Sequence, residues 1–106
     1  MDIRDRVKIA SLFSEYGALL TDRQRETLRL YVEMDMSLAE VAEEYGVTRQ
    51  AIKDAVKHAA EALQRYEDAL HLVAWKGEMR AALDEAAAAE PEMRERLAAA
   101  YGLLEG

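Results

Sequence analysis

Residues 37–58 hold the pattern that most restricts the fold, because they predict two short helices joined by a glycine turn. Ser37 can cap the first helix, and Glu40 three residues later completes a capping box. Gly46 stands where that helix must end, since a left-handed turn carries no Cβ penalty in glycine. Thr48 can then cap the second helix. The segment therefore predicts a helix-turn-helix, whose second helix usually lies in the DNA major groove.

The rest of the chain also favours helix. The 106 residues include one proline and five glycines, and no alternating run of β-branched residues predicts a strand. Apolar residues recur at helical spacing over residues 3–17 and, after a Thr21 cap, over residues 22–35. The positions expected to face the core are Ile9, Leu12, Phe13, Tyr16, Leu20, Leu28, Tyr31 and Val32. We expect an all-α, helix-turn-helix bundle of about four helices.

The second helix of the motif is predicted to be unusually long. No proline or glycine interrupts residues 49–75, so we expect one helix of about 25 residues, roughly 38 Å long. Gly77 is its expected end, and a helical C-terminal tail follows, in which Pro91 can open the last helix. We therefore predict a helix-turn-helix domain over residues 1–76 and a helical extension over residues 77–106. A helix that outruns its domain favours a homodimer with twofold symmetry.

Charge and cysteine content limit the function classes. The net charge is −7, and residues 61–106 carry most of the excess, with ten acidic and five basic residues. Such a chain binds nucleic acid only through a local basic face. There is no cysteine, and His58 and His71 are thirteen residues apart, so we expect no metal site and no cofactor. The N-terminus has no continuous apolar block that predicts a membrane segment, and we expect a cytoplasmic protein.

A basic stripe marks the candidate binding surface. Arg49, Lys53 and Lys57 lie at i, i+4 and i+8 on the second motif helix, with Gln50 beside them. Arginine can pair with guanine or phosphate, and glutamine with adenine. The alternative interpretation is a solvated helix face, which the neighbouring Asp54 also fits.

Arginines of the preceding helix extend this hypothesis. Arg23, Arg25 and Arg29 can contact backbone phosphates. Arg29 can equally pair with Glu33 four residues later, which would contribute only a few tenths of a kcal/mol.

Residues 12–73 resemble the YlxM family of small bacterial proteins, which is itself similar to the promoter-reading C-terminal domain of sigma factors. The resemblance covers well over half of the chain. Its most specific positions are Leu19 to Thr21, Leu30, Tyr31, Asp35, Ser37, Leu38, Ala42 to Tyr45, Arg49 to Ile52, Tyr66 and Glu67. This chain departs from the family pattern at His58 and Ala59, where a basic-polar pair is common, and in its alanine-rich tail.

The resemblance implies a regulatory helix-turn-helix protein tied to the signal recognition particle pathway. It places the recognition positions on Thr48, Arg49, Gln50, Lys53, Asp54 and Lys57. The partners it implies are DNA, or the RNA and proteins of the particle. A dimeric DNA-binding transcription regulator is the alternative hypothesis. No nucleophile elbow, glycine-rich phosphate loop or Ser-His-Asp pattern is present, so we expect no enzyme.

Overall fold

The computed structural model describes residues 1–105, and every regular element in that range is helical. The chain forms two compact units, one of Met1–Leu70 and one that begins at His71. The predicted all-α, helix-turn-helix class is confirmed. The described residues form seven α-helices rather than about four, because the tail alone contributes three. No helix among residues 1–105 is long and apolar enough to cross a membrane.

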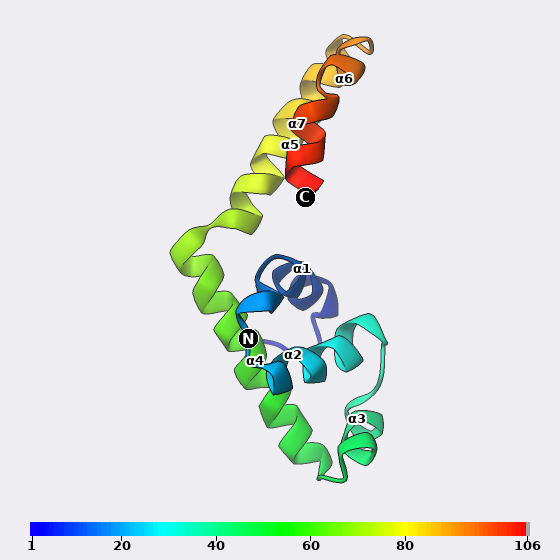
Figure 1. Ribbon diagram of the computed structural model, residues 1–106, viewed down its shortest axis with the longest axis vertical. Coiled ribbons are helices and arrows are strands. Elements are labelled where there is room, and N and C mark those ends of the chain that lie inside the picture. Colours follow the sequence, from blue (N-terminus) through cyan, green and yellow to red (C-terminus); the bar gives the residue numbers. More distant parts are fainter. Residues whose placement is uncertain (106) are drawn as a thin grey trace. The chain divides into compact units, whose positions relative to one another are not determined.

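The first unit is organised around α4 (Arg49–Leu70), a helix of 22 residues. The elements before it are α1 (Arg6–Tyr16), the 3-10 turn η1 (Gly17–Leu19), α2 (Asp22–Leu28), the π-helical turn η2 (Arg29–Glu33) and α3 (Leu38–Tyr45). The helices α1, α2 and α3 all contact α4, and Figure 1 shows them on the same side of it. One face of α4 therefore supplies the wall on which the rest of the unit packs.

The core of the first unit lies against that wall. The predicted inward residues that are buried are Ile9, Leu12, Phe13, Tyr16, Leu20, Leu28 and Tyr31. Val32 is only half-buried, and Leu30 is buried in its place. The α4 side chains in this core are Ile52, Val56, Ala59, Ala60, Ala62 and Leu63. Thr27 is polar and buried, and its hydroxyl donates to the Arg23 carbonyl at 2.8 Å, so its polar group is satisfied.

Two helix ends differ from the predictions. The helix expected over residues 22–35 is α-helical only to Leu28 and widens into η2. The long helix ends at Leu70 rather than at Gly77, because His71 adopts a left-handed conformation with φ 56°. Histidine is among the side chains that tolerate this region. Gly77 lies inside the next helix, since one interior glycine weakens a helix by only about 1 kcal/mol.

The second unit consists of α5 (Leu72–Ala89), α6 (Met93–Arg96) and α7 (Ala98–Glu105). Both short helices contact α5. The Tyr101 hydroxyl donates to Asp84 Oδ1 at 2.7 Å, and this hydrogen bond raises the pKa of Tyr101. The helix predicted to open at Pro91 begins at Met93 and is divided in two at Leu97. The division of the chain into domains 1–76 and 77–106 remains a prediction.

Candidate nucleic-acid interface

The helix-turn-helix forms through the local signals that the sequence predicts. Ser37 and Glu40 make a reciprocal capping box: Ser37 Oγ accepts from the Glu40 N–H at 3.0 Å, and Glu40 Oε1 accepts from the Ser37 N–H at 3.0 Å. Gly46 ends α3 at φ 67°, ψ 35°, and the Val47 N–H donates to the Ala42 carbonyl at 3.0 Å, as in a Schellman motif. The turn at Gly46 therefore ends α3 two residues before the Thr48 cap.

The start of α4 is set by Thr48, whose hydroxyl accepts from the Ala51 N–H at 3.1 Å. From there the helix buries one face and exposes the other. The predicted contact residues Thr48, Arg49, Gln50, Lys53 and Lys57 are all exposed, as the hypothesis requires. The basic stripe therefore lies at exposed positions beside the buried face of α4.

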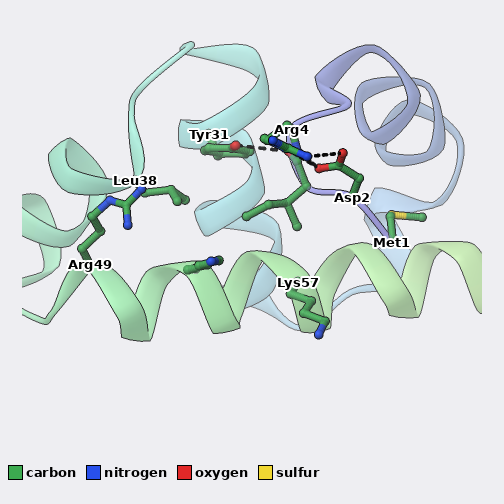
Figure 2. Close-up of a pocket in the computed structure, with 9 residues that line it drawn as sticks. Met1, Asp2, Arg4, Tyr31, Leu38, Arg49 and Lys57 are labelled. Atoms are coloured by element: carbon green, nitrogen blue, oxygen red, sulfur yellow. Dashed lines mark hydrogen bonds and ion pairs between the residues drawn. The ribbon is translucent and has the colours of Figure 1, made fainter.

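The stripe lines a surface hollow of about 420 Å³, shown in Figure 2. Arg49, Lys53 and Lys57 line it from α4, and the segment Met1–Arg4 lines it from the opposite side in Figure 2. Tyr31 and Leu38 also contribute. The sequence pattern thus leads to a concave site with two walls rather than to a stripe on a free helix.

The basic residues of the stripe on α4 are not neutralised by direct ion pairs among the described residues. Within residues 1–105, Arg49, Lys53 and Lys57 form no ion pair. Asp54, which also fits the solvated-face interpretation, accepts a hydrogen bond from Gln50 Nε2 at 3.0 Å. The amide proposed to read adenine is therefore held along the helix surface.

The arginines of α2 are engaged by the fold. Arg25 donates to the carbonyls of Gly17 and Leu20, each at 3.3 Å, and pairs with Asp22 at 3.4 Å. It therefore holds η1 against α2. The Arg23 guanidinium lies 3.6 Å from the centroid of the Tyr45 ring, a cation–π contact between α2 and α3. Neither side chain lines the hollow.

Arg29 pairs with Glu26 rather than with Glu33. The two bonds from its guanidinium to the Glu26 carboxylate measure 2.7 and 2.9 Å. This bidentate pair lowers the pKa of Glu26. The expected partner was wrong because Glu33 lies beyond the point where α2 widens into η2, so the i, i+4 spacing of an α-helix does not hold.

Sequence reasoning did not find the N-terminal cations. Arg4 lines the hollow, and Arg6 donates to the carbonyls of Tyr31 and Met36 and to Asp35 Oδ1. The Arg6 guanidinium also lies 3.8 Å from the Tyr31 ring centroid. These contacts join residues 25 to 30 positions apart in the chain, which no local pattern predicts.

Residues 1–105 contain no group of three or more His, Cys, Asp or Glu side chains that could hold a metal ion. The pKa shifts in the first unit come from hydrogen-bonded surface pairs and the capping box, because Asp2, Glu26 and Glu40 each accept bonds that lower their pKa. The site therefore offers a ligand positive charge and a concave surface.

Fold and site together define a helix-turn-helix protein with a basic surface at its second motif helix. The family model described as "UPF0122: Putative helix-turn-helix protein, YlxM / p13 like" matches residues 3–98. The chain belongs to this family, which confirms the resemblance seen in the sequence.

Named relatives support the same assignment. UPF0122 proteins of Streptococcus equi subsp. zooepidemicus, Streptococcus gordonii and Streptococcus pneumoniae are each 46% identical to this chain over 72 residues. The matched region is 68% of this chain and 64%, 66% and 66% of those three proteins, respectively. The alignment therefore spans just under two thirds of each relative's own length.

Proposed function

We propose that this protein is a regulatory helix-turn-helix protein that binds nucleic acid through the start of α4. The contact residues are Thr48, Arg49, Gln50, Lys53 and Lys57. The observation that carries the proposal is the unpaired row of Arg49, Lys53 and Lys57 on the exposed side of α4. Like charges at i, i+4 destabilise a helix by about 0.2–0.5 kcal/mol per pair, so folding gains nothing from the row. A polyanion such as a nucleic acid binds more tightly because of the row.

The family resemblance directs the choice of nucleic acid. It implies a link to the signal recognition particle, so the RNA of that particle is the first candidate ligand. The acidic remainder of the chain, with a net charge of −7 overall, also suits contact with the basic proteins of a ribonucleoprotein. We propose that the protein regulates the particle through this RNA contact, in the cytoplasm and without enzymatic activity of its own.

The test is a titration of labelled signal recognition particle RNA with the wild-type protein at several salt concentrations. Arg49→Ala and Lys53→Ala are expected to weaken binding, and each should reduce the slope of log K against log salt by about 0.7–0.9. Arg65→Ala is the matched control, because Arg65 is an exposed cation of α4 outside the hollow. Equal losses in all three variants, or no wild-type binding at about 50 mM salt, would refute the proposal.

The alternative ligand is duplex DNA, bound by a dimeric transcription regulator. The intact turn at Gly46 favours it, because the same two-helix geometry places recognition helices in the major groove. Selection from random duplex DNA tests this candidate. Enrichment of a sequence with two related half-sites would support it, and failure to enrich any sequence at moderate salt would exclude it. Sedimentation at high micromolar concentration tests the proposed dimer separately.

A further inference from the structure

The wall of the hollow opposite α4 carries a fourth cation that the proposed function does not use. Arg4 projects from the segment Met1–Arg4, and its side chain is 88% exposed. That segment is tied down behind the site, because the Tyr31 hydroxyl donates to the Ile3 carbonyl at 3.1 Å. Arg4 therefore faces the hollow from an anchored backbone rather than from a free end.

Arg4 is held by one carboxylate. Its backbone N–H and its Nε both donate to Asp2 Oδ1, at 2.9 and 3.1 Å, and its Nη2 donates to Asp2 Oδ2 at 3.2 Å. A guanidinium has five N–H donors, so the bonds to Asp2 leave the two Nη1 hydrogens and one Nη2 hydrogen available. Arg4 can thus contact a second anion without first losing Asp2.

We propose that the hollow binds the sugar-phosphate backbone of a nucleic acid, with Arg4 on one wall and Arg49, Lys53 and Lys57 on the other, and that Asp2 weakens this binding. The inference rests on the proposed function and adds to it a second wall and an opposing charge. Asp2 is the acidic residue among those that line the hollow. Hydrogen bonds from Arg4 lower the pKa of Asp2, so its carboxylate is negative at neutral pH, where it repels phosphate.

The spread of the cations favours a chain of phosphates over a single phosphate group. Arg49 and Lys57 are eight residues apart, which is about 12 Å along the helix axis. Figure 2 shows their side chains well separated along α4. One phosphate cannot contact both, whereas successive phosphates of one strand can, and Arg4 lies across from them.

The experiment compares variants that change one charge each. Arg4→Gln and Asp2→Asn are titrated with labelled signal recognition particle RNA and with a labelled random-sequence duplex DNA. Glu105→Gln is the matched control for Asp2→Asn, because Glu105 also pairs with an arginine, the half-buried Arg80 at 3.5 Å, in the second unit. Both substitutions raise the net charge by one, and only Asp2 lies at the proposed site.

We expect Arg4→Gln to reduce the slope of log K against log salt by about 0.7 for single-stranded RNA or 0.9 for duplex DNA. Arg4→Lys should retain most of the slope, because it retains the charge. Asp2→Asn should strengthen binding about threefold, the factor for one unit charge roughly 6 Å from a phosphate in water. Glu105→Gln should bind like the wild type. Circular dichroism of each variant checks that the fold is retained.

The outcomes separate this inference from the proposed function. If Lys53→Ala weakens binding while Arg4→Gln and Asp2→Asn do not change it, the second wall is wrong and the proposed function stands. If the wild type binds neither nucleic acid, both fail. Inorganic phosphate at about 10 mM and constant ionic strength should not displace the nucleic acid. Displacement would mean that the hollow takes a lone phosphate, and the backbone proposal would be overturned.

Discussion

Replacing Gly46 by alanine tests whether the left-handed turn between α3 and α4 is required. Gly46 has φ 67°, and a Cβ built there has no heavy atom within 4 Å. The change therefore adds no steric overlap with neighbours, so its effect on stability reports the cost of the left-handed backbone conformation alone. A left-handed residue with a Cβ costs about 1–2 kcal/mol. Loss of chain entropy in the unfolded state recovers about 0.4–1 kcal/mol. We expect a net destabilisation of about 1 kcal/mol.

Gly77 provides the matched control for this substitution. It also has no neighbour within 4 Å of a built Cβ, but it lies inside α5 with ordinary helical geometry. The same glycine-to-alanine change should stabilise that helix by about 0.5–1 kcal/mol. The two variants thus carry identical chemistry and opposite expected signs, about 1.5–2 kcal/mol apart.

The measurement is urea unfolding followed by far-ultraviolet circular dichroism. With a slope of about 1–3 kcal/mol per molar urea, Gly46→Ala should lower the midpoint by about 0.3–1 M. The chain has one tryptophan, Trp75 in α5, so its fluorescence assigns the Gly77→Ala effect to the second unit. Gly46→Asn should lose less stability than Gly46→Ala, because asparagine tolerates this left-handed conformation. A Gly46→Ala variant as stable as the wild type would refute the reasoning.

Three further predictions concern other parts of the fold. Ala42 is 4% exposed in α3, so Ala42→Leu should overpack the core and destabilise the protein by about 1–3 kcal/mol in the same urea assay. The pKa of Glu40 is lowered from 4.5, mainly because its carboxylate accepts from the Ser37 N–H. The stabilisation from the Glu40 carboxylate is present above the pKa of Glu40 in the unfolded state, and it is lost as the pH falls through the pKa of Glu40 in the folded state. Thermal melts should therefore show the wild type losing stability relative to Glu40→Gln below about pH 4.5, and parallel curves would contradict this. His71→Gly should stabilise the Trp75-reported transition by about 0.5–1 kcal/mol, because it removes a left-handed side chain, whereas His71→Ala should give no gain.

The sequence predicts the local features of this fold well, because their causes are local. A capping residue and its N3 partner are three positions apart, so the Thr21 cap, the Ser37–Glu40 box and the turn at Gly46 follow from short stretches. The exposed stripe of α4 follows from helical periodicity alone.

The features that the sequence does not predict depend on distant contacts or on small energy differences. Thr27, Leu28, Leu30 and Tyr31 are buried at a spacing that an ordinary α-helix also shows, so nothing in the pattern reveals η2. The break at His71 reflects a left-handed backbone conformation, which histidine tolerates but rarely adopts. For the candidate site, the α4 wall was predictable and the Arg4 wall was not, because the approach of the first residues to Tyr31 is a tertiary contact across 28 positions.

The two faces of α4 have a consequence for how proteins of this kind can diverge. The side chains that hold the first unit together, such as Val56 and Leu63, lie on the buried face of the helix, and the candidate ligand contacts lie at exposed positions beside it. Substitutions at the exposed positions change stability by about 0.5 kcal/mol or less. Ligand preference can therefore shift through single mutations that leave the scaffold intact, and a new partner can be acquired without an intermediate that fails to fold.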